Sequence, residues 1–213
     1  MSFNIPTETI ELPSKGLLYP EDHILSNGTI EIKYMTAKEE DILTNQNYIA
    51  NGTVIDKLLK SLIVTKVDYN DILIGDKNAI MIAARILGYG AEYTFKYNNV
   101  EETVDLSQID NKPIDESLYT KGENEFSLTL PASGNEITFK LLTHGDEVKV
   151  SKELEGLKKL NKDGSPELTT RLKHMITSIN GDRERKTIRE FVDQAFLARD
   201  TKALREQIQK IQP

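Results

Sequence analysis

The hydrophobic pattern of this chain changes its period near Gly145, and that change limits the folds that the chain can adopt. Before this point, short segments that alternate apolar and polar residues and are separated by turn signals, which is typical of antiparallel hairpins, occur together with helical segments. After it, apolar residues recur three and four positions apart, as at Ile188, Phe191 and Val192, which is typical of helices. We therefore predict an α+β fold with small antiparallel sheets, an extended N-terminal arm and a helical C-terminal part.

Four parts are predicted along the chain. They are an extended arm, an α/β part with a buried central helix, a polar loop, and a hairpin followed by helices, at residues 1–22, 23–106, 107–124 and 125–213. The arm follows from Pro6, Pro13 and Pro20, which lack backbone donors and bias the residues before them away from helix. Because apolar residues lie between these prolines, the arm must rest either on its own domain or on a neighbouring protein.

Turn and capping signals place the individual elements. Hairpin turns are expected at Asn27-Gly28, Asn98-Asn99 and Ser133-Gly134-Asn135. Thr36 and Glu39 have the spacing of a capping box before a helix. The central helix should begin at Asp76 and end at Gly88. Later helices are expected at about residues 145–160, 167–179, 184–198 and 200–211, with a loop at 161–166 after the first.

One short pattern occurs twice. Residues 31–40 and 138–147 each read as a strand, then a Thr that caps a helix, then acidic residues in the first helical turn, where they favour the helix dipole. Few positions are identical between the two segments. Both a duplicated strand-to-helix unit and the independent use of one capping solution are consistent with the pattern.

Charge and composition exclude several classes of protein. The formal net charge is -7, and residues 1–144 hold 12 Lys and Arg against 22 Asp and Glu, so we expect no general nucleic-acid binding. Residues 145–213 reverse this balance, with 15 basic against 12 acidic residues, which suits either an oriented contact with a partner or two solvated surfaces of different sign. The absence of Cys excludes disulfides and thiol catalysis. No apolar run approaches the roughly 18 residues of a membrane helix, and no signal peptide is visible, so we expect synthesis in a cytoplasm and no membrane insertion.

No pattern points to catalysis or to a metal. His23, His144 and His174 lack the spacing that places two ligands on one helix face. The acidic pairs Glu39-Glu40 and Glu101-Glu102 suit a helix cap and a strand better than acid–base chemistry. We therefore expect no enzyme activity, no cofactor and no metal.

Three blocks of the sequence are distinctive in their order and spacing. They lie at residues 12–19 with 35–41, at 72–79 with 83–86 and 88–93, and at 179–181 with Ile188, 191–192, 198–200 and 204–205. Together they resemble the baseplate hub subunit family of T-even-type contractile-tailed bacteriophages. The resemblance implies a structural or assembly role in the central hub of the tail baseplate, with other hub proteins and possibly further copies of this chain as partners. It implies no catalytic residues. Relatives often carry paired cysteines that suggest zinc, and since this chain has none, a zinc role is not carried over.

Within this resemblance, the arm is the candidate docking element. Lys15 and Tyr19 would supply charge and aromatic contact, and Gly16 would allow close approach of a partner backbone, with Pro13 and Ser14 beside them. Alternatively, the arm covers the edge of its own sheet.

Three side chains of the central helix, Asp76, Asn78 and Arg85, are expected to fix that helix through capping and a buried ion pair rather than to contact a partner. Three other functions stay open. They are a tail-associated hydrolase, a transient chaperone of hub assembly that is absent from the finished particle, and a regulatory binding protein unrelated to phages.

Overall fold

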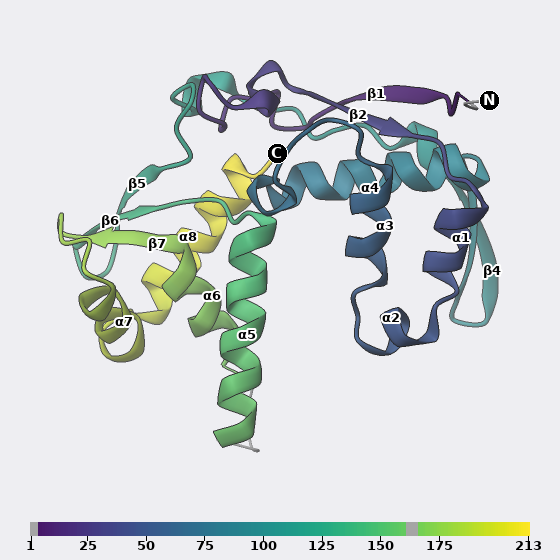
Figure 1. Cartoon of the computed structure of the whole chain (residues 1–213). Helices are drawn as coiled ribbons and strands as arrows, with labels where there is room; N and C mark the ends of the chain where they lie inside the picture. Colours follow the sequence, from purple (N-terminus) through teal and green to yellow (C-terminus); the bar gives the residue numbers. More distant parts are fainter. Residues whose placement is uncertain (1–3, 161–165) are drawn as a thin grey trace. The chain divides into compact units, whose positions relative to one another are not determined.

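A computed structural model describes residues 4–160 and 166–213, and it confirms the α+β class. These residues form eight α-helices and three small antiparallel sheets (Figure 1). The chain divides into two compact units. Unit 1 holds the described residues up to Val67 together with Gly75–Ile114 and Pro213, and unit 2 holds Asp68–Ile74 with the described residues of Asp115–Gln212. The main boundary therefore falls inside the segment 107–124.

The predicted arm contributes a strand to the first sheet of unit 1. Strand β1 (Thr7–Glu11) pairs antiparallel with β2 (Thr29–Lys33). Alternation along β2 buries Ile30 and Ile32 on one face of the pair, because successive side chains of a strand point to opposite faces. The prediction of a hairpin turn at Asn27-Gly28 is wrong, because β2 pairs with the distant β1 and Gly28, with a φ of +78°, instead ends the short 3-10 helix η1 (Ile24–Asn27).

Four helices complete the main framework of unit 1. They are α1 (Ala37–Leu43), α2 (Gln46–Ala50), α3 (Val54–Leu62) and α4 (Ile74–Tyr89). The prediction that α4 ends at Gly88 is wrong, because the left-handed residue after the helix is Gly90, with a φ of +84°. Gly88 has a packing role instead, since a Cβ there would come within 2.7 Å of the Met35 sulfur.

Burial of α4 is confined to one stripe. Asp76, Ile80 and Ala84 are its buried residues, four positions apart, while Met81 remains 39% exposed. The nearly continuous apolar sequence of this helix predicts burial on several sides, and the structure corrects that prediction. Part of the apolar surface of α4 is therefore left without cover from the described residues of unit 1.

Hydrogen bonds around a buried carboxylate fix the start of α1. Glu39 closes the predicted capping box by accepting from the backbone N–H of Thr36 at 3.0 Å and from its hydroxyl at 2.6 Å. Lys33 and Ser61 also donate to this carboxylate, at 2.9 and 2.7 Å. Burial alone would raise the pKa of Glu39, but the donors from Lys33, Ser61 and Thr36 outweigh it and lower the pKa to about 2.

Unit 2 combines a three-stranded sheet with four helices. The sheet has the order β5-β6-β7, from Phe126–Thr129, Glu136–Phe139 and Ile176–Ile179, and every pairing is antiparallel. The helices are α5 (His144–Leu160), α6 (Glu167–Met175), α7 (Arg185–Gln194) and α8 (Ala198–Ile211). The loop expected at 161–166 lies outside the described residues except for Pro166.

The helix predicted over 167–179 is too long, because its last four residues form β7. Helix α6 ends at Met175, and Ile176 adopts an extended conformation with a ψ of 129°. Ile176, Thr177 and Ile179 are β-branched and favour a strand, and pairing with β6 rewards that preference. Asn180 and Gly181 then close the turn with positive φ, as expected of this pair.

The pattern that occurs twice in the sequence forms the same local structure in both units. Thr143 and Asp146 exchange hydrogen bonds at 3.3 Å at the start of α5, as Thr36 and Glu39 do at the start of α1. In each unit a Lys six residues before the acid donates to its carboxylate, at 2.9 Å in unit 1 and at 2.7 Å from Lys140 in unit 2. The similarity thus includes a lysine contact as well as the cap.

A second contact also recurs between the units. In unit 1 the backbone N–H of Ser14, in the turn after β1, donates to Asp76 at 3.0 Å. In unit 2 the N–H groups of Ala132 and Ser133, in the turn after β5, donate to Asp200 at 2.7 and 3.1 Å. Each Asp is buried and stands third in its helix, α4 or α8. The turns share the sequence Leu-Pro, two variable residues and a left-handed Gly, at residues 12–16 and 130–134.

We predict an acid-sensitive contribution from the cap of α1. Because the folded state lowers the pKa of Glu39 from 4.5 to about 2, this contribution is complete above about pH 4.5 and is lost as the pH falls through about 2. The unaltered protein should therefore lose unfolding free energy when the pH falls from about 6 to about 3. In the Glu39→Gln variant this loss should be smaller by on the order of 1–2 kcal/mol. Urea unfolding at the two pH values measures this, with Glu101→Gln, an exposed carboxylate, as the control. Equal losses in the unaltered protein and in the Glu39 variant would contradict the prediction.

Candidate functional site

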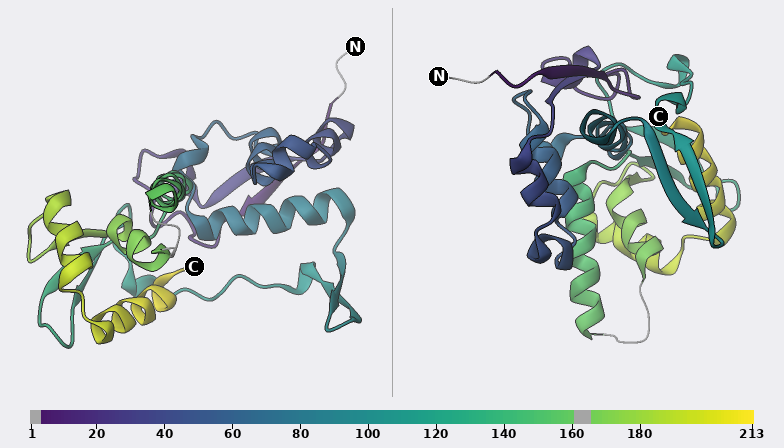
Figure 2. Two further views of the ribbon diagram at one scale, coloured as in Figure 1. Left: turned by 90° about the horizontal axis from the view of Figure 1, so that it is seen from below. Right: turned by 90° about the vertical axis from the view of Figure 1, so that its right-hand side faces the viewer.

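The residues predicted for docking lie mainly against their own unit. Ser14 and Tyr19 are 1% and 4% exposed, and both side chains donate to the carboxylate of Asp76, each at 2.7 Å. Figures 1 and 2 show α4, which carries Asp76, lying along the β1–β2 pair. The turn of the arm is therefore part of the core of unit 1. This is the alternative in which the arm covers its own domain.

The close backbone approach expected at Gly16 is made by the chain itself. A Cβ at Gly16 would come within 2.7 Å of the Gly28 nitrogen, and Gly16 has a φ of +76°. Pro13 is buried, so Lys15 is the one exposed residue of the five candidates. It borders a groove of about 520 Å³ within unit 1, between the turn at 11–15, the turn at 27–29 and residues 111–114.

Asp76 holds the turn in place rather than capping its own helix. Burial raises the pKa of Asp76, while the hydrogen bonds from Ser14 and Tyr19 act in the opposite direction. The expected ion pair with Arg85 is wrong. Arg85 instead donates to the carbonyl groups of Gly90 and Glu92 at 2.9 and 3.3 Å.

We predict that this contact contributes to the stability of unit 1. Asp76→Ala would leave three buried donors unpaired and should lower the unfolding free energy by about 3 kcal/mol. Tyr19→Phe removes one donor and should cost about 1 kcal/mol. Thermal and urea unfolding measure both changes. The matched control is Tyr97→Phe, because Tyr97 is 65% exposed. If the arm were a detachable docking element, Asp76→Ala would leave the melting temperature unchanged.

A different surface of unit 1 has the character of a protein-binding site. The hairpin of β3 (Glu92–Tyr97) and β4 (Val100–Asp105) projects from the end of α4 in Figure 2, and all residues of both strands are exposed. Its register places most of the apolar residues on one face, since Tyr93 lies opposite Val104 and Tyr97 opposite Val100. We call this the aromatic face. It consists of Tyr93, Phe95, Tyr97, Val100, Glu102 and Val104.

An apolar groove begins at the base of the aromatic face. Its volume is about 660 Å³. It is lined by side chains from α1, α3, α4 and the hairpin, at residues Met35, Leu43, Ile55, Leu58, Leu59, Met81, Ile82, Ala84, Arg85, Tyr89, Tyr93 and Leu106. Arg85 stacks on Tyr89 and Tyr93, with 5.1 and 5.6 Å from the guanidinium carbon to the ring centres, and so holds the aromatic wall in position.

Sequence reasoning predicted the β3–β4 hairpin but not this site. The turn at Asn98-Asn99 is confirmed, with φ of 49° and 63°. The signal was present in the alternation of aromatic residues along β3, which a half-buried strand would also show. What the sequence could not show is that no described part of unit 1 covers this face.

The histidines have local contacts in the structure. The Nδ1 atom of His23 accepts from the Leu25 N–H at 3.2 Å, His144 packs its ring against Tyr69, and the Nε2 atom of His174 lies 3.0 Å from Glu153. Within residues 4–160 and 166–213, no group of three or more His, Asp or Glu side chains could hold a metal ion. No helix in the described part of the chain is long and apolar enough to cross a membrane.

Comparison with known proteins gives no match. No family model, no curated protein and no solved structure matches this chain.

Proposed function

We propose that this chain is a structural or assembly component of the central hub of a phage tail baseplate, acting through protein–protein contacts. It would fold in the host cytoplasm and act in the tail baseplate. The resemblance of three ordered sequence blocks to the T-even-type hub subunit family supports the phage assignment. The aromatic face and the apolar groove support the contact function, because an enzyme that acts on a small substrate does not require an exposed apolar surface of this kind.

One observation carries the contact function. The apolar side of α4 and the aromatic face of the hairpin are both uncovered in unit 1, where Tyr89, Tyr93 and Val100 are 49%, 43% and 57% exposed. Contiguous apolar surface of this kind costs free energy in water and typically marks a protein-binding site. Aromatic residues at its centre are the side chains that contribute most to binding.

The groove suggests the form of the partner. A helix with an apolar stripe can insert side chains into a groove of this kind, and the hairpin offers a wall beside it. Carboxylates lie beside this surface: Glu40 accepts from the Tyr89 hydroxyl at 2.8 Å, and Glu102 belongs to the aromatic face. A hub protein segment with apolar residues flanked by Lys or Arg would therefore fit best.

We predict that substitutions on the aromatic face abolish association with hub proteins. Phe95→Thr with Tyr97→Thr keeps the strand propensity but removes two aromatic side chains, and each should cost on the order of 1–2 kcal/mol of binding. Co-purification of the tagged chain with co-expressed hub proteins measures the loss. Lys96→Thr with Glu101→Thr alters a cross-strand pair on the opposite face and is the matched control.

Equal loss of binding in both double variants, with unchanged thermal melting, would contradict a role for the aromatic face. Association with hub proteins would then have to use another surface.

Analysis of purified phage particles distinguishes a permanent subunit from a transient chaperone. A permanent subunit should be detected by mass spectrometry of finished tails, whereas a transient chaperone should be found only in assembly intermediates. A peptidoglycan zymogram with the purified chain tests the hydrolase alternative, and clearing by the chain alone would overturn the proposed function.

A further inference from the structure

Unit 2 has a concave surface with a different chemistry. It is a pocket of about 520 Å³, which we call the cationic pocket. Its lining residues are Lys140, Asp146, Lys149, His174, Ile176, Thr177, Arg183, Arg185 and Ile188. Two lysines and two arginines thus line the pocket with one carboxylate, in a chain whose net charge is -7. Such a local reversal of sign raises the local concentration of anionic groups.

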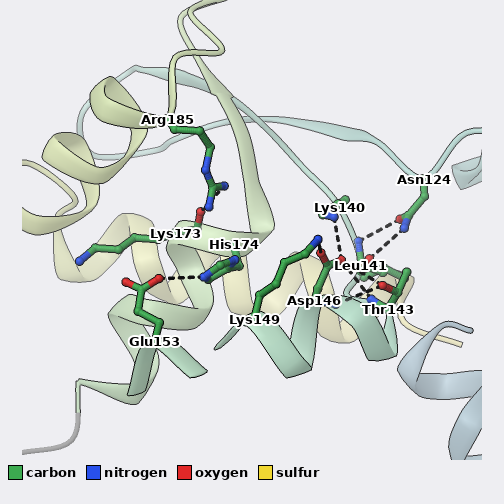
Figure 3. Close-up of polar contacts among 10 residues, drawn as sticks. All are labelled: Asn124, Lys140, Leu141, Thr143, Asp146, Lys149, Glu153, Lys173, His174 and Arg185. Atoms are coloured by element: carbon green, nitrogen blue, oxygen red, sulfur yellow. Dashed lines mark hydrogen bonds and ion pairs between the residues drawn. The ribbon is translucent and has the colours of Figure 1, made fainter. Parts of the chain in front are cut away.

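One side of the pocket holds two lysines on a single carboxylate. Asp146 accepts from Lys140 at 2.7 Å and lies 3.4 Å from Lys149, as Figure 3 shows. Burial would raise the pKa of Asp146, but the contacts with Lys140, Thr143 and Lys149 lower it, so the carboxylate stays ionised. One negative charge therefore balances only one of the two lysines. Lys149, which is 67% exposed, is the more accessible of the pair.

The other side of the pocket is formed by arginines. Arg183 is neutralised by a two-point contact with Glu125, at 2.9 and 2.8 Å. Arg185 instead donates to the carbonyl oxygen of Lys173 at 3.1 Å, and among the described residues no carboxylate pairs with it. In Figure 3 Arg185 lies on the side of His174, apart from the two lysines at Asp146. Its guanidinium keeps donors that can bind a carboxylate at two points.

His174 already has a carboxylate partner. Its ring contacts Glu153, which also pairs with Arg189. The hydrogen bond from Arg189, together with that from His174, lowers the pKa of Glu153 to about 2. The carboxylate of Glu153 is therefore ionised at neutral pH and contacts both neighbours. The uncompensated cations are those of Arg185 and of the lysine pair.

We propose that the cationic pocket binds an acidic segment of a partner protein, with Arg185 and Lys149 as the principal contacts. The cations form two separate groups, and the buried Ile176 and Ile188 also line the pocket, which suits several carboxylates along a polypeptide better than one compact phosphate. A nucleic acid strand is disfavoured, because its backbone needs an extended cationic track, whereas Asp146 in the lining and Glu125 at Arg183 interrupt the cationic surface. The site is independent of the apolar groove and of the assignment to a phage.

Fluorescence polarisation with a labelled peptide of alternating Glu and Leu tests the proposal on the full chain. The buffer should hold about 0.15 M salt, so that charges beyond about 8 Å are screened. Arg185→Glu with Lys149→Glu should weaken binding at least about tenfold. Lys186→Glu with Lys202→Glu makes the same change in net charge at exposed residues outside the pocket and should leave binding within about twofold.

Further probes decide the class of ligand. The same peptide with Gln in place of Glu should not bind, and inorganic phosphate should not compete at millimolar concentration. Stronger binding of a labelled oligonucleotide than of the acidic peptide would overturn the proposal, and so would equal loss in the two double variants or no binding by the unaltered chain. Arg185→Gln, which removes the charge without reversing it, should give a partial loss, and melting temperatures check that each variant is folded.

Discussion

A buried carboxylate that binds backbone N–H groups of a turn is the contact on which this structure depends most. Asp76 ties the turn after β1 to α4 through Ser14 and Tyr19, and so joins the N-terminal strand to a helix more than sixty residues later in the chain. Whether it is ionised or neutral, a carboxyl group costs free energy when it is buried without hydrogen-bond partners. The three donors to Asp76 therefore favour the one position of the turn in which all of them reach it. The arm is held within unit 1 for this reason, and four of its five candidate docking residues are withdrawn from solvent.

Local rules predicted the local structure well. The hairpin turn at Asn98-Asn99, the capping box at Thr36, and the amphipathic helix that was predicted over 184–198 and found at Arg185–Gln194 all follow from interactions between residues a few positions apart. The errors at Gly88 and in β7, and the missed role of Asp76, share one cause. Each depends on a partner distant in sequence, such as Met35, β6 or the turn at Ser14, and periodicity alone carries no information about such partners. The aromatic face was missed for the opposite reason, since its lack of a covering element cannot be read from the strands that form it.

The two units repeat more than the sequence pattern suggested. Each has a strand, a Leu-Pro turn fixed by a buried Asp in the first turn of a later helix, a second strand, and a Lys whose ammonium group contacts the acid that caps the next helix. The segment that pairs with the second strand also corresponds between the units. Ile63 forms an antiparallel bridge with Ile32 in unit 1, and Ile176 pairs with Phe139 in unit 2. A common capping solution accounts for one of these contacts but not for their joint occurrence in the same chain order. The agreement therefore favours a duplicated unit over convergence.

A shared framework explains how two small units can present such different surfaces. The contacts that recur are internal: the caps, the lysine partners of the capping acids, and the Asp-bound turns. The surfaces differ, with an apolar groove and aromatic face in unit 1 and a cationic pocket in unit 2. In unit 2 the contact of Lys140 with Asp146 also lines the cationic pocket, but the Asp-bound turns do not line the groove or the pocket. Most side chains of these surfaces are therefore free to be selected for partners. Specificity can then differ between the units without loss of the fold.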